Sequence, residues 1–174
     1  MVFTDIGGSQ GDRQQAYETI ASQLGGLLEG ERDPWANSAN AASLLFTALP
    51  DLNWTGFYFL RGGELVVGPF QGAPACVRIA LGRGVCGTAA VSRQTLVVPD
   101  VHAFPGHIPC DAASNSEIVV PILVADRLVG VLDLDSPLQG RFDEVDARGL
   151  ERVARLIATG CDWKLAGIDS FESS

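Results

Sequence analysis

EIVVPILVADRLVGVLDL is the sequence of residues 117–134, and it has the pattern of two apolar strands joined by a short turn. Residues 117–124 and 128–134 are rich in branched aliphatic side chains, and Ala125-Asp126-Arg127 separates them. Pro121 is the one residue of this stretch that interrupts the aliphatic run of the first strand. The stretch therefore predicts a β-hairpin.

The residues before this hairpin predict further strands. Residues 53–60 are rich in aromatic side chains, Arg61-Gly62-Gly63 is typical of a turn, and residues 64–67 continue as a strand. Short strands are also predicted at residues 76–81 and 95–98, with an alanine-rich helix at 85–92 between them. Residues 99–115 show no period, and a loop this long inside a compact domain is usually functional.

Helices are predicted at both ends of the chain. Apolar residues recur at helical spacing in residues 11–30, 33–50 and 143–164, and Asp33-Pro34 is typical of a helix start. This order of elements predicts one α+β domain, with a central antiparallel sheet and helices packed mainly on one side. We expect this single domain to occupy residues 1–174, with a core at about 12–164.

Composition excludes several classes of protein. The 174 residues include 21 acidic and 12 basic ones, and a net charge of −9 argues against binding to nucleic acid. The longest strongly apolar stretch, residues 118–125, is far shorter than the roughly 20 residues of a membrane helix. The first residues show no signal-peptide pattern, so we expect a soluble cytoplasmic protein that does not contact membranes.

The four cysteines differ in their predicted settings. Cys161 falls on the apolar face of the last helix, which indicates a structural role. Cys86 falls where a turn becomes a helix, a position that stabilises a thiolate, although packing explains it equally well. Cys110 lies in the long loop, where a cysteine is uncommon unless its reactivity is used. Cys76 opens a predicted strand and would be a core residue if it stood alone.

The residues also bear on two other kinds of site. Cys76, Cys86, His102, His107 and Cys110 could converge on a metal ion, but no pair has the spacing of structural zinc ligands, so no metal is expected. Neither a serine-hydrolase motif nor a complete dinucleotide fingerprint is present.

Carboxyl groups gather at one end of the predicted sheet. Asp133 and Asp135 alternate along a strand and so share a face, and Glu117 begins the partner strand. Mutual repulsion would raise at least one pKa toward the range of an acid catalyst. A solvated strand end explains these residues equally well.

Three motifs together resemble one enzyme family. GVCGTA at residues 84–89, PDVHAFPGHIPCDAASNSEIV at 99–119 and GVLDLDS at 130–136 closely resemble the free methionine-(R)-sulfoxide reductases, small enzymes built on a GAF domain. The similarity runs from about residue 12 to 164, nearly the whole chain. One departure is Pro109, where the family pattern suggests a small residue such as alanine.

The resemblance implies roles for particular residues. Cys110 would be the nucleophile, Cys76 the main resolving thiol, and Cys86 a supporting or alternative one. The substrate pocket would consist of Trp54, Tyr58, Glu117, Asp133 and Asp135. Backbone N–H groups of residues 106–110 would hold the substrate carboxylate, which would exclude peptide-bound methionine sulfoxide.

The resemblance also implies the reaction. Free L-methionine-(R)-sulfoxide would be reduced to methionine through a sulfenic acid and an intramolecular disulfide, and a thioredoxin-like dithiol would reduce the enzyme again. No metal or organic cofactor would be needed, and the family suggests a homodimer. The alternative is a GAF module that binds a small ligand or senses redox state through its thiols without turnover.

Overall fold

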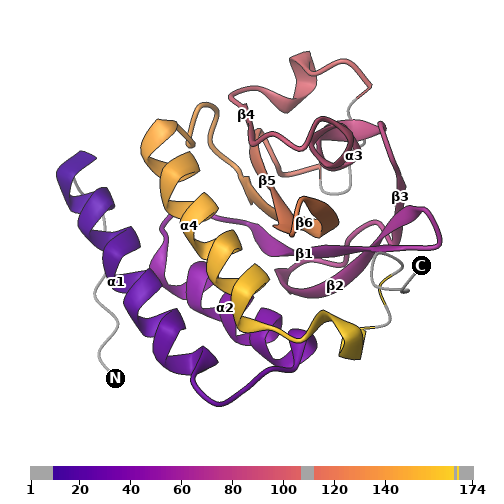
Figure 1. Cartoon of the computed structure of the whole chain (residues 1–174). Coiled ribbons are helices and arrows are strands. Elements are labelled where there is room, and N and C mark those ends of the chain that lie inside the picture. Colours follow the sequence, from indigo (N-terminus) through magenta and orange to yellow (C-terminus); the bar gives the residue numbers. More distant parts are fainter. Residues whose placement is uncertain (1–9, 107–111, 167, 169–174) are drawn as a thin grey trace.

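The computed structural model describes residues 10–106, 112–166 and 168. These residues form two helices, three strands, a third helix, three more strands and a last α-helix, in that order along the chain (Figure 1). The α-helices are α1 (Gln10–Leu28), α2 (Pro34–Ala48), α3 (Gly84–Ser92) and α4 (Glu144–Gly160). The strands are β1 (Trp54–Arg61), β2 (Glu64–Gly72), β3 (Arg78–Ala80), β4 (Leu96–Val98), β5 (Ser116–Val124) and β6 (Arg127–Ser136).

The strands form one antiparallel sheet in the order β3-β2-β1-β6-β5-β4. The predicted hairpin at residues 117–134 is β5 and β6, which lie inside the sheet and are joined at Ala125 and Asp126. Both turn residues have positive φ, 47° and 62°, which is the geometry of a tight two-residue hairpin turn. The predicted α+β class and antiparallel sheet are confirmed.

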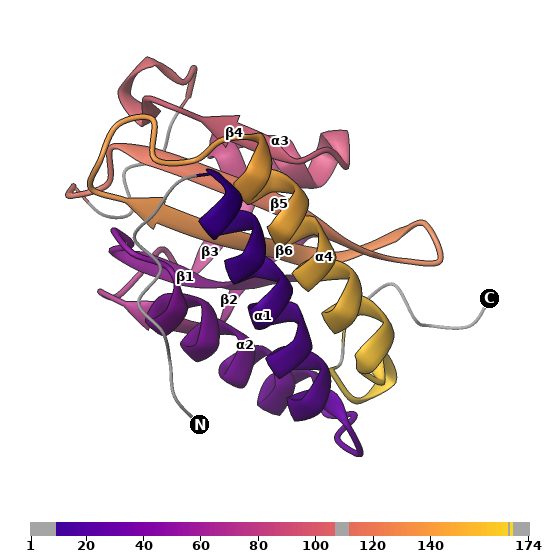
Figure 2. The same cartoon turned by 90° about the vertical axis from the view of Figure 1, so that its left-hand side faces the viewer.

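Helices cover the two faces of the sheet unequally. Figure 1 shows α2 and α4 on one face and α3 on the other, and Figure 2 shows α1 packed over α2 and α4. The larger core fills the space under α1, α2 and α4, with Phe57, Phe59 and Leu132 among its buried residues. The prediction that helices lie mainly on one side is therefore confirmed, and α3 is left to cover the opposite face.

Local sequence explains where α2 and α4 begin. Asp33 accepts hydrogen bonds from the N–H groups of Trp35 and Ala36, at 2.8 and 2.9 Å, so it caps α2 as predicted. Asp143 and Asp146 form a reciprocal capping box at the start of α4. Both helices thus start at residues whose side chains satisfy otherwise unpaired backbone donors.

Some element boundaries differ from the prediction. The last helix ends at Gly160, not near Lys164, because Cys161 is extended and the N–H of Asp162 bonds to the carbonyl of Arg32 at 2.7 Å. A short 3-10 helix, Trp163–Ala166, follows. Strand β3 starts at Arg78, so Cys76 precedes the strand and does not open it. Across the described residues, no helix is both long enough and apolar enough to cross a bilayer.

Candidate active site

Three neighbouring strands bring the predicted pocket residues onto one face of the sheet. Trp54 and Tyr58 come from β1, Asp133 and Asp135 from β6, and Glu117 from β5. In the sheet register, Asp135 lies opposite both Trp54 and Glu117. Since side chains alternate along a strand, all five share the face that α3 covers. Sequence alternation predicted this for the two aspartates, and the register adds the other three.

Aromatic rings form one wall of this site. Trp54 is 3% exposed and stacks on Tyr58 and Phe70, with ring centroids 5.8 and 5.4 Å away. Its indole N–H donates to the carbonyl of Ala73 at 3.1 Å, which ties the ring to the segment that leads into Cys76. The indole is therefore held in one orientation and presents a fixed apolar surface.

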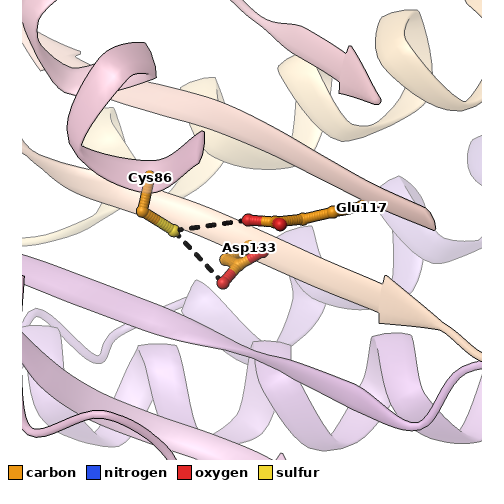
Figure 3. A group of neighbouring side chains, drawn as sticks. All are labelled: Cys86, Glu117 and Asp133. Atoms are coloured by element: carbon orange, nitrogen blue, oxygen red, sulfur yellow. Dashed lines mark hydrogen bonds between the residues drawn. The ribbon is translucent and has the colours of Figure 1, made fainter. Parts of the chain in front are cut away.

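Helix α3 packs on this face of the sheet and points Cys86 toward the carboxyl groups of Glu117 and Asp133 (Figure 3). The start of the helix packs closely on the preceding turn: the N–H of Gly82 donates to the carbonyl of Gly87 at 2.8 Å. A Cβ at Gly87 would lie 2.4 Å from the carbonyl oxygen of Ala80, so only glycine permits this approach. The contact fixes the first turn of α3, and with it Cys86, above the sheet.

Cys86, Glu117 and Asp133 form a buried cluster. The Cys86 thiol lies 3.2 Å from Asp133 Oδ2, to which it donates a hydrogen bond, and 3.9 Å from Glu117 Oε1. The residues are 4%, 7% and 5% exposed. Asp133 Oδ1 is also buried, and no described residue donates a hydrogen bond to it. An acceptor in this state favours a ligand that brings N–H or O–H donors.

Burial dominates the electrostatics of the cluster. Burial raises the pKa of Asp133 to about 7, although the hydrogen bond from Cys86 lowers it. Burial and the neighbouring Asp133 and Asp135 raise the pKa of Glu117 well above its usual range. The two coupled carboxyls therefore retain a proton near neutral pH. The sequence-based prediction of a raised carboxyl pKa is confirmed, and burial is a larger cause than the predicted repulsion.

The same surroundings reverse the prediction for the Cys86 thiol. Its place at the start of α3 favours a thiolate, but burial and the carboxyls of Asp133 and Glu117 raise its pKa well above the usual value. The stabilisation of a thiolate that the helix start predicts for Cys86 is therefore outweighed. No sequence-local signal reveals this, because the carboxyls come from distant strands.

A pocket opens between α3 and the sheet. All five predicted substrate residues and Cys86 line it. Arg83 and Ser114 also line it, and sequence reasoning had assigned neither to the site. Arg83 stands between two glycines that read as a flexible turn, and Ser114 lies inside the long motif without a distinctive pattern of its own. Ser114 is held in place by Asn53, whose amide donates to its hydroxyl at 2.9 Å.

The other cysteines are placed as follows. Cys76 is disulfide-bonded and lies beside the pocket, next to the lining residues Pro74 and Ala75. Cys110 and His107 lie outside the described residues. Cys161 is a buried free thiol in the larger core, where the Asn37 amide donates to its sulfur at 3.5 Å. Its predicted structural role agrees with this position.

The cluster differs from the metal-ligand set that the sequence offers. Among the described residues, one group of three potential ligands has its atoms within 4.8 Å of one another, and it consists of Cys86, Glu117 and Asp133. His102 is not part of it, since its Nε2 pairs with Asn115 Oδ1 at 3.0 Å.

Comparison with known proteins agrees with this geometry. The model of the GAF domain matches residues 12–160. Protein YtsP of Bacillus subtilis is 54% identical, over 84% of this chain and 91% of its own length. Free methionine-R-sulfoxide reductase of Escherichia coli is 49% identical, over 82% of this chain and 86% of its own length.

Solved structures give the same answer. The substrate complex of free methionine-R-sulfoxide reductase from Neisseria meningitidis superposes with a TM-score of 0.84 at 41% identity, covering 91% of this chain and 95% of that one. The chain belongs to the free methionine-R-sulfoxide reductase family, a group of oxidoreductases built on a single GAF domain.

Proposed function

We propose that this chain reduces free L-methionine-(R)-sulfoxide to L-methionine. The observation that carries the proposal is the pocket itself, in which the Trp54–Tyr58 stack lies next to the buried, proton-retaining carboxyls of Glu117 and Asp133. The aromatic wall suits the S-methyl group, and the carboxyls suit the ammonium and sulfoxide oxygen. Relatives named for this activity support the assignment.

The proposed chemistry begins at Cys110. Its thiolate attacks the sulfoxide sulfur, the S–O bond breaks, and the oxygen is transferred so that Cys110 becomes a sulfenic acid and methionine leaves. The substrate sulfur gains two electrons and the cysteine sulfur loses two. A proton must reach the oxygen as charge develops on it, and the protonated carboxyls of the pocket can supply it.

Cys76 would complete the cycle by attacking the sulfenic acid, which releases water and forms a disulfide. Two facts support this pairing: Cys76 is disulfide-bonded, and Cys86 and Cys161 are free. An external dithiol of the thioredoxin type would then reduce the disulfide, and the cytoplasm is the compartment where such a reductant is maintained. In this scheme Cys86 supports the site. The reductase domain spans residues 1–174, and two copies of the chain form a homodimer.

The first test is turnover with separate R and S epimers of free methionine sulfoxide and excess dithiol. We expect many equivalents of methionine from the R epimer alone. Disulfide formation without turnover of either epimer would favour a redox-sensing GAF module, and absence of both would favour a ligand-binding one.

A second test separates the roles of the cysteines. Cys110→Ser should abolish methionine formation in a single turnover, whereas Cys76→Ser should preserve that first turnover and slow recycling. Cys161→Ser is the matched control, because this thiol lies in the other core and should leave both steps unchanged. A full first turnover in Cys110→Ser would transfer the nucleophile's role to another cysteine.

A further inference from the structure

The charges that line the pocket are arranged unequally. Three carboxyl groups line it, from Glu117, Asp133 and Asp135, while Arg83 is the one lysine or arginine among its described lining residues. A free amino acid brings an ammonium group and a carboxylate into this space together. The acidic side chains suit the ammonium, but they repel the carboxylate unless a positive charge stands near it.

Arg83 is placed to supply that charge. Its backbone is fixed at the start of α3, since its N–H donates to the carbonyl of Ala80 at 3.1 Å and its carbonyl accepts from Gly87 at 3.0 Å. Its side chain is exposed, and it forms no ion pair with any described residue. The guanidinium therefore remains available to a ligand, where a planar fork can hold a carboxylate through two hydrogen bonds.

The separation of the charges also fits a zwitterion. An ion pair between Arg83 and a pocket carboxyl would require the charged atoms to lie within about 4 Å, and none of the described ion pairs joins Arg83 to Glu117, Asp133 or Asp135. Acidic and basic groups thus line different parts of one pocket. A ligand whose ammonium and carboxylate groups are bonded to the same carbon can bridge the acidic and basic sides of the pocket.

We propose that Arg83 is a specificity-determining residue that binds the α-carboxylate of the free amino-acid substrate. This inference rests on the proposed function and adds to it a side-chain basis for the choice of free over peptide-bound sulfoxide. A peptide-bound residue carries neither charge, so it leaves the guanidinium unpaired and gains nothing from the carboxyls.

The test compares two substrates that differ in the carboxylate alone: free L-methionine-(R)-sulfoxide and its α-amide, below about pH 7 so that both carry an ammonium group. With wild type, kcat/KM should favour the free acid. Arg83→Gln should lower kcat/KM for the acid by about tenfold, mainly through KM, and leave the amide unchanged. Arg83→Lys should restore part of the preference, because it keeps the charge without the fork.

Arg78→Gln is the matched control. Arg78 is an exposed arginine on β3, next to the lining residue Ile79, but it pairs with Glu64 at 3.4 Å and does not line the pocket. Its loss should leave the preference for the acid intact. Equal losses for acid and amide in Arg83→Gln, or an unchanged ratio of the two, would overturn the role of Arg83.

A binding measurement keeps this inference separate from the proposed function. Titration of the resting protein with L-methionine and L-methioninamide should show a preference for methionine that Arg83→Gln removes. If wild type turns over the R sulfoxide and Arg83→Gln still prefers methionine, only the inference about Arg83 fails. If wild type shows no turnover but prefers methionine, and Arg83→Gln lacks this preference, the proposed reaction fails and the carboxylate site stands.

Discussion

Cys86 and Asp133 influence each other through one short contact. The thiol donates to Asp133 Oδ2 at 3.2 Å, and this hydrogen bond stabilises the carboxylate, so it lowers a pKa that burial holds near 7. The carboxyl in turn raises the pKa of the thiol. At neutral pH Cys86 is therefore a protonated donor that lowers the pKa of Asp133, a role that needs no thiolate.

Replacing Cys86 with alanine should raise the pKa of Asp133 above its wild-type value of about 7, because the carboxylate loses its donor. Titration of the Asp133 carboxyl carbon by NMR measures this directly. Cys161→Ala is the control, since that thiol contacts Asn37 in the other core and should leave the Asp133 titration unchanged. An unchanged or lower pKa in Cys86→Ala would show that the thiol is not an effective donor.

The residue scale also marks the limit of what sequence can predict about the site. Alternation along one strand was enough to place Asp133 and Asp135 on a common face, and the family motif pointed to Trp54, Tyr58 and Glu117. The state of Cys86 could not be predicted, because its pKa depends on carboxyls 31 and 47 residues away in the chain. Arg83 was missed for a related reason, since its neighbours along the chain describe only a turn.

Helices α1 and α4 meet at a contact that depends on the lack of a side chain at Gly149. Tyr17 of α1 lies over Gly149 of α4, and its hydroxyl donates to the buried Asp146 at 2.8 Å. Asp146 also pairs with Arg13 and Arg141, at 2.9 and 3.3 Å. The glycine lets the two helices approach, and the ionic network fixes their register.

Gly149→Ala should therefore destabilise the protein by about 1–3 kcal/mol, because a Cβ would be forced into the Tyr17 ring and the interface would have to move. The ideal Cβ lies 2.2 Å from Tyr17 Cγ. Urea unfolding measures the loss. Activity of the folded variant should match wild type, since the pocket lies on the opposite face of the sheet.

Gly25→Ala in α1 is the control for helix propensity. No neighbouring atom lies within 4 Å of its would-be Cβ, so the change should stabilise the helix by roughly 0.5–1 kcal/mol. A gain of stability in both variants would mean that the α1–α4 interface yields easily, contrary to the close packing seen here.

Elements were predicted well where periodicity is long, and less well where a tertiary contact ends them. The β5–β6 hairpin and α2 agree with their patterns to within a residue or two. The end of α4 was misplaced because the backbone bond from Asp162 to Arg32 stops the helix, while the apolar pattern continues into Trp163. Such a stop depends on a loop more than a hundred residues earlier and leaves no local signal.

At the scale of the whole molecule, the sheet separates two cores with different tasks. The core under α1, α2 and α4 contains aliphatic and aromatic side chains and has more buried apolar residues than the other core. The core under α3 includes Trp54, Tyr58 and Cys86 and adjoins the buried carboxyls of Glu117 and Asp133. Burying ionisable groups costs free energy, so the α3 side should be the less stable part of the fold at pH values where they ionise.

This asymmetry predicts how stability depends on pH. The pKa of Asp133 is raised to about 7 in the folded protein, above the roughly 3.9 of an unfolded chain. The folded state therefore binds more protons than the unfolded state between these values, and the favourable contribution of protonated Asp133 is full below about pH 4 and lost as pH rises through 7. The raised pKa of Glu117 acts in the same direction.

Asp133→Asn removes the ionisation and should abolish much of this loss. Its melting temperature should equal that of wild type near pH 4 and exceed it by at least about 2 °C at pH 8, while turnover should fall because the pocket loses a proton-carrying group. Ser22→Ala, an exposed change on α1 that involves no ionisable group, should alter the melting temperature equally at both pH values. A difference between Asp133→Asn and wild type that does not grow with pH would mean that Asp133 is already ionised in the resting fold, and that the proton for the sulfoxide oxygen must come from Glu117 or from solvent.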